Sequence, residues 1–218
     1  MKLALIGATG FVGKHLLKEA LQRHHQVTAI IRGDEGRLKA EDENLAVIKA
    51  DVLSVDSLVT ALAGHEVCLS AYNPGWKNDR LYDEFLTGSL NIQMACKKAG
   101  VKRLLVVGGA GSLEVTPGAQ LVDDPGFPLE WKEGAMAARD YLKELRNEKE
   151  LDWVFLSPAI QMNPGTSGIR TGAYRIGKDQ PVFDVNRISK ISVEDTAVAL
   201  LDEVEQPQHH RERFTVAY

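Results

Sequence analysis

Apolar residues along the chain follow two alternating patterns, one of short dense runs and one of longer periodic segments. The short runs are rich in Val, Ile and Leu and predict buried strands at Lys2–Ile6, Gln26–Ile31, Leu45–Lys49, Val67–Ala71, Arg103–Val107, Asp152–Leu156 and near Arg213–Ala217. The segments between them repeat apolar residues every three or four positions and predict helices at Phe11–His24, Ser57–Leu62, Arg80–Ala99, Glu130–Glu148 and Val193–Val204. This alternation is typical of strand–helix–strand units around a mostly parallel sheet.

Glycine and proline mark where these elements end. Gly64 and Gly100 each follow a predicted helix, at the position where a left-handed residue commonly ends one. Thr116–Pro128 and Ser157–Pro181 are rich in Gly and Pro without a clear period. We expect long loops there, rather than further strands of the central sheet.

The composition narrows the class of protein. Of 218 residues, 44% are hydrophobic and 26% charged, which is ordinary for a globular protein with one substantial core. Lys and Arg number 26 against 30 Asp and Glu, and no dense basic run is available to neutralise a phosphate backbone. No apolar run approaches the roughly 20 residues of a membrane-spanning helix, and the first one stops at Gly7. We therefore expect a cytoplasmic protein with a small-molecule substrate, and neither nucleic acid nor a membrane as partner.

Residue types that often bind metals are present but badly spaced. Cys68 and Cys96 form no metal-ligand pattern and lie in apolar segments, so they predict reduced thiols in the core. The pairs His24-His25 and His209-His210 have no carboxylate or cysteine at ligand spacing, and we expect both pairs on the surface. The sequence predicts no metal site.

A glycine-rich turn, GATGFVG, connects the first predicted strand to the first helix. Gly7 permits a tight turn, Gly10 lets the backbone approach a pyrophosphate, and Gly13 lets the helix pack closely on the strand. The free N–H groups and dipole of the helix N-terminus then favour an anion. The turn therefore predicts a dinucleotide site, which Thr9, Phe11 and Val12 line together with the three glycines.

The spacing of GATGFVG resembles that of the short-chain dehydrogenase/reductase superfamily. The stretches Ala50-Asp51-Val52, Ser70-Ala71-Tyr72, Leu151-Asp152-Trp153, Ser157-Pro158-Ala159 and Ile191-Ser192-Val193-Glu194-Asp195 resemble its atypical branch. That branch includes NAD(P)H-binding, NmrA-like and NADH-flavin-reductase proteins, often named NAD-dependent epimerase/dehydratase. The resemblance extends over nearly the whole chain.

Pattern and resemblance together predict the fold. We expect an α/β protein with a Rossmann-like, doubly wound parallel sheet in three α/β/α layers and strand order 3-2-1-4-5-6. Residues 1–218 are expected to form one domain, in which about 157–218 contribute a small substrate-side lobe.

The resemblance also implies positions around the cofactor. It places Asp51 and Val52 beside the adenine, although Asp51 also suits an ordinary turn or helix cap. It further assigns residues beside the ribose and nicotinamide, namely Ser70, Ala71, Tyr72, Gly108, Pro158 and Ala159.

The residue at the end of the second strand distinguishes the two dinucleotides. An arginine there pairs with the 2′-phosphate of NADP, whereas a carboxylate bonds the ribose hydroxyl of NAD. Arg32 occupies this position, about 25 residues beyond Gly7, and Arg37 is a possible second donor. Asp34 and Glu35 would repel a phosphate if they pointed inward, and Arg32 also suits a solvated loop. NADP(H) is preferred, with NAD(H) as the alternative.

The usual catalytic pair of the superfamily is missing. The resemblance calls for Tyr-x-x-x-Lys on the helix before the sixth strand, but that helix has only Tyr141, followed four residues later by Leu145. The literal match Tyr174…Lys178 lies in a loop-rich region and is interpreted as coincidence. Ser112 follows the fifth strand late; it either faces the nicotinamide or satisfies the loop backbone. It is the one catalytic candidate.

Aromatic residues suggest a substrate pocket beyond the carboxyl ends of the strands. Asn73 and Trp76 lie on one short loop and suit a planar ring, or simply a packed turn. Trp131 occupies the neighbourhood of the missing family tyrosine and would add an apolar wall.

Three functions remain open at this point. The first is an NADPH-dependent reductase of a flavin-like or quinone-like acceptor, which needs stacked geometry more than an acid. The second is a sugar-nucleotide epimerase or dehydratase, and the third is a non-catalytic NADP(H)-sensing regulator of the NmrA type. Whether the chain is an active enzyme also stays open. Whether it is a monomer or a homodimer stays open as well, because Leu86, Leu90 and Met94 suit either a core or a dimer surface.

Overall fold

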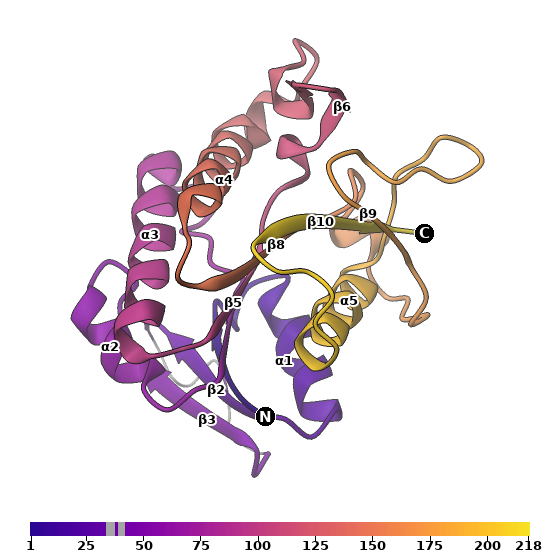
Figure 1. Cartoon of the computed structure of the whole chain (residues 1–218). Coiled ribbons are helices and arrows are strands. Elements are labelled where there is room, and N and C mark those ends of the chain that lie inside the picture. Colours follow the sequence, from indigo (N-terminus) through magenta and orange to yellow (C-terminus); the bar gives the residue numbers. More distant parts are fainter. Residues whose placement is uncertain (34–37, 39–41) are drawn as a thin grey trace.

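Eight strands form one sheet in the part of the chain that the computed structural model describes, residues 1–33, 38 and 42–218 (Figure 1). In spatial order they are β3 (Leu45–Lys49), β2 (Gln26–Ile31), β1 (Lys2–Ile6), β4 (Val67–Ser70), β5 (Arg103–Val107), β8 (Asp152–Ser157), β10 (Glu212–Ala217) and β9 (Arg175–Gly177). All neighbouring pairs are parallel except β10 and β9. The predicted strands and their order are thus confirmed, while Asp34, Glu35 and Arg37 lie outside the described residues.

One strand contradicts the prediction that Ser157–Pro181 contains only loops. β9 lies in this segment and pairs antiparallel with β10, with Ile176 opposite Val216. β9 has only three residues and pairs with one strand at the edge of the sheet, so it needs no long apolar run. Because two of its residues are exposed, its sequence shows no alternation of apolar and polar positions that would predict a strand. A separate small hairpin joins β6 (Glu114–Thr116) to β7 (Ala119–Gln120) and lies apart from the central sheet.

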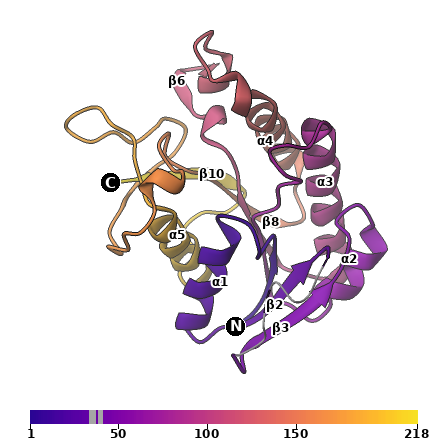
Figure 2. The same cartoon turned by 180° about the vertical axis from the view of Figure 1, so that it is seen from behind.

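Five α-helices cover the two faces of this sheet within the described residues. α1 (Gly13–Gln22) and α5 (Val193–Glu205) pack together on one face, while α2 (Val55–Leu62), α3 (Leu81–Ala99) and α4 (Leu129–Asn147) cover the other (Figures 1 and 2). Short 3-10 turns occur at Ala110–Ser112, Leu121–Asp123 and Pro164–Thr166. The three α/β/α layers are as predicted.

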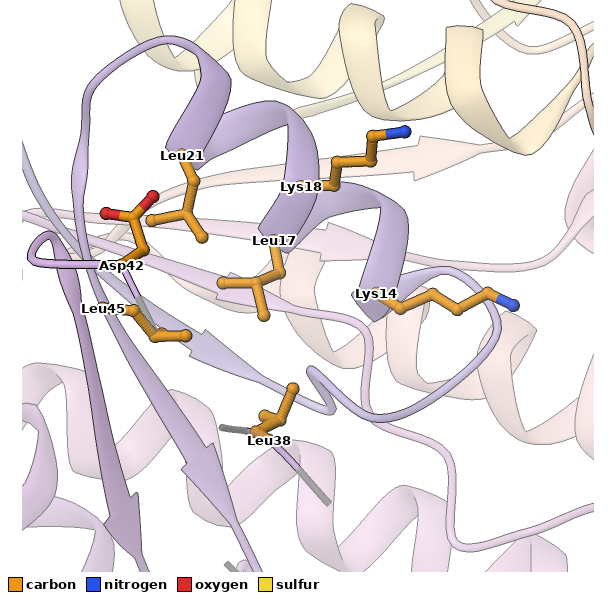
Figure 3. Close-up of a pocket in the computed structure, with 7 residues that line it drawn as sticks. All are labelled: Lys14, Leu17, Lys18, Leu21, Leu38, Asp42 and Leu45. Carbon is orange, nitrogen blue, oxygen red and sulfur yellow. The ribbon is translucent and has the colours of Figure 1, made fainter. Parts of the chain in front are cut away.

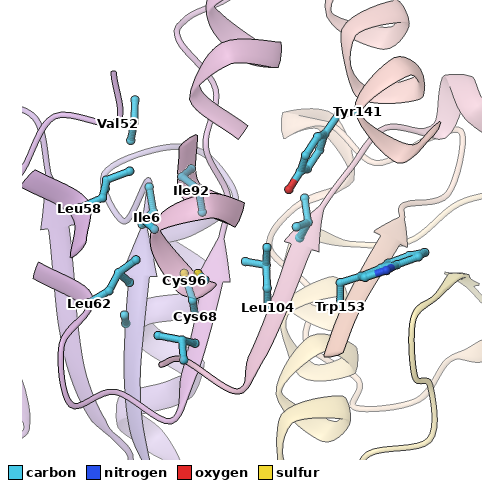
Figure 4. Close-up of a cluster of buried hydrophobic side chains, with 14 of the residues drawn as sticks. Ile6, Val52, Leu58, Leu62, Cys68, Ile92, Cys96, Leu104, Tyr141 and Trp153 are labelled. Carbon is cyan, nitrogen blue, oxygen red and sulfur yellow. The ribbon is translucent and has the colours of Figure 1, made fainter. Parts of the chain in front are cut away.

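The core has two halves because successive strand residues point to opposite faces. In β1, Leu3 and Leu5 pack toward α1 and α5, whereas Ala4 and Ile6 pack toward the other three helices. Figure 4 shows the second half, where the free thiols of Cys68 and Cys96 lie together in the apolar core.

This packing shows which of several side chains are buried and which are exposed. Leu86 and Leu90 pack against the core, whereas Met94 is 48% exposed. The expectation that both histidine pairs lie on the surface is wrong for one member of each pair. His25 and His209 are buried, because α5 supplies a carboxylate to each ring.

Candidate dinucleotide site

The glycine-rich turn lies against the end of β4. Gly7 has a φ of +82°, which favours glycine, and its carbonyl oxygen accepts a hydrogen bond of 2.9 Å from the Gly10 amide. A Cβ on Gly7 would lie 2.5 Å from the Ala71 carbonyl oxygen, so no side chain fits between the turn and the strand. The tight turn predicted for Gly7 is present.

Helix α1 begins in direct contact with this turn. A Cβ on Gly13 would lie only 1.9 Å from the Gly7 carbonyl oxygen, so only glycine permits this close packing. No side chain caps the N-terminus of α1. The Lys14, His15 and Leu16 amides already donate to backbone oxygens of the turn, so the positive end of the helix dipole is what favours an anion such as a pyrophosphate here.

Gly10 differs from the other two glycines because its surroundings are open. Among the described residues, a Cβ there would approach only the Gly7 carbonyl oxygen within 4 Å, at 3.2 Å. Gly10 and Thr9 are exposed, and the Phe11 ring contacts His15 edge-on with 6.0 Å between centroids. The turn thus leaves space for a ligand above Gly10, and its residues fit the phosphates of a dinucleotide.

The ends of β2, β3 and β4 bring charged groups near this turn. Arg32 and Asp51 are exposed, and the Asp51 carboxylate accepts a hydrogen bond of 2.9 Å from the Leu53 amide. Burial, with smaller contributions from the charges of Glu84 and Asp51, raises the pKa of Tyr72 to about 12. The charge of Arg32 opposes this rise. Arg32, Asp51 and Tyr72 therefore lie close enough to interact electrostatically.

Two of the residues predicted to border the cofactor have buried side chains. Val52 is 7% exposed and belongs to the core beneath α2 and α3. Ser70 is 4% exposed at the end of β4. Neither side chain is therefore exposed to a ligand at the surface.

The Tyr72 ring turns away from the glycine-rich turn and packs on α3. Its hydroxyl donates a hydrogen bond of 3.1 Å to the Glu84 carbonyl oxygen, and its ring stacks on Phe85 with 6.1 Å between centroids. A Cβ on Gly88 would lie 2.5 Å from the Tyr72 ring. The phenol is therefore engaged inside the protein.

The loop after β5 also directs its candidate residues inward. A Cβ on Gly108 would lie 2.0 Å from the Phe155 ring, so this glycine makes room for a core aromatic residue. Ser112 is 1% exposed; its hydroxyl donates to the Gly109 carbonyl oxygen at 3.2 Å and accepts from the Arg213 guanidinium at 3.3 Å. The Ser157 hydroxyl lies 3.3 Å from it. Of the two alternatives for Ser112, this geometry favours the satisfied loop hydroxyl.

The Tyr-x-x-x-Lys match does not form a catalytic pair. Tyr174 and Lys178 flank strand β9; the Tyr174 hydroxyl donates to Asp202 at 2.6 Å, and the Lys178 ammonium lies 3.3 Å from Glu212. Tyr141 is buried in the core, where desolvation raises its pKa. In the described part of the chain, neither tyrosine is available as an acid beside the turn.

Two tryptophans remain exposed near the carboxyl end of the sheet. Trp76 is 59% exposed and Trp131 is 48% exposed. The Trp76 ring touches α4 at Gly134, one helical turn after Trp131. Asn73 closes the turn between β4 and Trp76, where its side-chain oxygen accepts a hydrogen bond of 2.7 Å from the Gly75 amide. Pro158 and Ala159 follow β8 and are buried.

A hollow of about 530 Å³ lies elsewhere, between α1 and the β3 edge of the sheet (Figure 3). It is lined by Lys14, Leu17, Lys18, Leu21, Leu38, Asp42 and Leu45. These residues belong to α1, the β2–β3 connection and the first position of β3, so the hollow is separate from the loops that follow β4, β5 and β8. Over residues 1–33, 38 and 42–218, no group of three His, Cys, Asp or Glu side chains is arranged to hold a metal ion.

Fold and turn together define a Rossmann-like dinucleotide-binding protein. The family model described as NAD(P)H-binding matches residues 7–204, and the chain belongs to this NAD(P)H-binding family. This family is oxidoreductase-like, and the resemblance to NAD(P)H-binding and NADH-flavin-reductase proteins is thereby confirmed.

Relatives of full length carry different descriptions. The chain is 38% identical over 99% of its length to the uncharacterized protein YwnB of Bacillus subtilis, covering 98% of that protein. It is similar to the structure of a "putative epimerase" from Bacteroides thetaiotaomicron, with 48% identity, a TM-score of 0.91, and coverage of 100% of this chain and 96% of that one. It also resembles a "putative NADH-flavin reductase" from Streptococcus pneumoniae, with 35% identity, a TM-score of 0.84, and coverage of 100% and 99%.

Location in the cell stays a prediction. No helix in the described segments is both long enough and apolar enough to cross a bilayer.

Proposed function

We propose that this protein is an NADPH-dependent reductase of a planar acceptor of the flavin or quinone type. The observation that carries this proposal is a complete dinucleotide turn in a chain whose nearby hydroxyl groups are directed inward. The Tyr72 hydroxyl bonds to α3, Ser112 bonds to Arg213, and Tyr141 is buried in the core. A bound nicotinamide supplies the hydride, and a conjugated acceptor takes its proton from solvent. The chain then has to align two rings and keep them in contact.

The preference for NADP(H) rests on Arg32. Its guanidinium is exposed at the end of β2, where a 2′-phosphate would lie in a fold of this kind. Gly7, Gly10 and Gly13 would hold the pyrophosphate through the backbone and the N-terminus of α1. NAD(H) is the alternative, and the description of the Streptococcus protein, which names NADH, supports it.

The acceptor class rests on the exposed aromatic residues. Trp76 and Trp131 offer apolar ring faces near the carboxyl end of β4, and Asn73 adds a polar group. The Streptococcus relative supports a flavin-type acceptor.

Epimerase or dehydratase activity is the second candidate, because the Bacteroides relative is described as an epimerase. Such chemistry needs a group that moves the hydroxyl proton, and the positions expected for that group hold no free acid in the described chain. A third possibility is a regulator that binds NADP(H) without turnover.

One titration separates the three. NADPH and NADH are titrated calorimetrically, and FMN, FAD or a quinone is then added anaerobically while the nicotinamide absorbance is followed. Tight NADPH binding with acceptor-dependent oxidation supports the reductase. Binding without oxidation of any acceptor contradicts it and favours the regulator. Conversion of a nucleotide sugar without net oxidation of the cofactor would favour the epimerase.

A further inference from the structure

Two helices beside the loop that follows β4 each contain a buried glycine in their interior. These are Gly88 in α3 and Gly134 in α4. Glycine destabilises a helix interior relative to alanine, so each position needs a local reason.

The reason in both cases is an aromatic ring from the same loop. A Cβ on Gly88 would lie 2.5 Å from Tyr72 Cε1, and a Cβ on Gly134 would lie 2.7 Å from Trp76 Cζ3. Both separations are far below an ordinary carbon–carbon contact. The two helices therefore have hollows that receive the two rings of the 72–76 loop.

These contacts hold the loop at both of its ends. The Tyr72 hydroxyl also donates to the Glu84 carbonyl oxygen, one turn before Gly88 in α3. Between the two rings, the hydrogen bond from the Gly75 amide to Asn73 Oδ1 closes a turn. The loop thus crosses from α3 to α4 with both aromatic residues in fixed places.

Trp76 is held by its edge and remains largely open to solvent. Its Cζ3 and Cη2 atoms face Gly134, yet the side chain is among the exposed large apolar residues, at 59%. Trp131 precedes Gly134 by three residues, so it lies on the same side of α4, and it is 48% exposed. One exposed indole therefore lies against α4 and the other extends from α4, one helical turn earlier.

We propose that Gly88 and Gly134 are positioning residues that seat Tyr72 and Trp76, so that Trp76 and Trp131 together form an aromatic surface for the planar acceptor. This inference rests on the proposed function for the identity of the acceptor. The expected ligand is a conjugated ring system, because a planar π-system can stack on the face of an indole.

The seating of Trp76 is tested without any ligand. The chain has three tryptophans, and Trp153 is buried at 2% exposure, so Trp131→Phe leaves Trp76 as the accessible emitter. Gly134→Ala in this background should shift the emission to the red and increase acrylamide quenching, because the new methyl group displaces the ring. Unchanged emission and quenching would overturn the seating.

A double-mutant cycle provides the matched control. Gly134→Ala should raise the Tm in a Trp76→Ala background, because alanine favours the helix once the ring is gone. In the presence of Trp76 the same substitution should lower the Tm or leave it unchanged. Equal Tm changes in both backgrounds would contradict contact between the two positions.

The aromatic surface is tested with FMN as the probe. Gly134→Ala should raise the Kd for FMN, and the KM in turnover, about three- to tenfold, the loss expected for one stacked contact. The Kd for NADPH and kcat should stay unchanged. Equal weakening of FMN and NADPH would refute a positioning role. If the unmodified protein binds FMN but never oxidises NADPH, the proposed reductase activity is contradicted while the aromatic surface stands. If the unmodified protein binds no FMN, the aromatic surface is overturned.

Discussion

Gly10→Ala is the most direct test of the dinucleotide site. The backbone at this position is not in the left-handed region, so alanine adds no conformational strain. Among the described residues, its Cβ would meet only the Gly7 carbonyl oxygen within 4 Å, at 3.2 Å, a tight contact that a small shift relieves. The folded protein should therefore accept the methyl group with little change in Tm.

A bound pyrophosphate should not accept it. The methyl group would occupy the space above the turn and push the phosphates away from the backbone of the turn and the N-terminus of α1. Hydrogen bonds to a charged group are worth about 1.5–3 kcal/mol each. Loss of one such bond weakens binding roughly tenfold to a hundredfold, since about 1.4 kcal/mol corresponds to a factor of ten.

The assay is calorimetric titration of NADPH into the parent, Gly10→Ala and two comparison variants. Gly33→Ala is the matched control, because a Cβ there meets nothing within 4 Å in the described structure. Gly13→Ala places a Cβ 1.9 Å from a backbone oxygen and should lower the Tm as well as binding. If Gly10→Ala binds NADPH as tightly as the parent does, the turn is not the pyrophosphate site.

Three further predictions follow from single contacts. Arg32→Asp should weaken NADPH binding far more than NADH binding in the same titration, and equal loss for both would remove Arg32 from cofactor selection. Ser112→Ala should lower the Tm, because the buried Arg213 guanidinium loses an acceptor, while turnover persists; lost turnover at an unchanged Tm would instead indicate a catalytic hydroxyl. Burial raises the pKa of Glu148, but hydrogen bonds to its carboxylate outweigh this effect and lower the pKa from 4.5 to about 2. The carboxylate therefore stabilises the folded protein above pH 4.5, and this stabilisation is lost as the pH falls toward 2. Urea unfolding should therefore show Glu148→Gln less stable than the parent at pH 7, by roughly 1–3 kcal/mol, with a smaller difference near pH 3; a constant difference would refute this linkage.

Much of the fold was predictable because periodicity reports which faces are buried. The runs at Gln26–Ile31 and Arg103–Val107 have the bounds observed for β2 and β5, since buried parallel strands carry dense apolar sequence. Gly100, with a φ of +74°, ends α3 as predicted, because that conformation depends on one residue. β9 escaped prediction because its pairing partner, β10, lies more than thirty residues later in the chain.

Some features of the candidate site were likewise predictable from the sequence, and others were not. Gly7 and Gly13 were recognisable because a turn and its helix involve neighbouring residues. The inward direction of Tyr72 was not recognisable, since Gly88, which receives its ring, belongs to another element. Glycines inside two predicted helices were the available signal for those contacts.

By itself, the amino-acid sequence determined the order of strands and helices, the left-handed glycines and the dinucleotide turn, because each depends on local conformation or on a repeated pattern of burial. Only the tertiary structure decided which side chains remain free for chemistry. Ser112 meets Arg213 from the far end of the chain, and Trp76 meets α4 across a loop. Contacts of this kind depend on how separate elements pack together, and no local pattern encodes them.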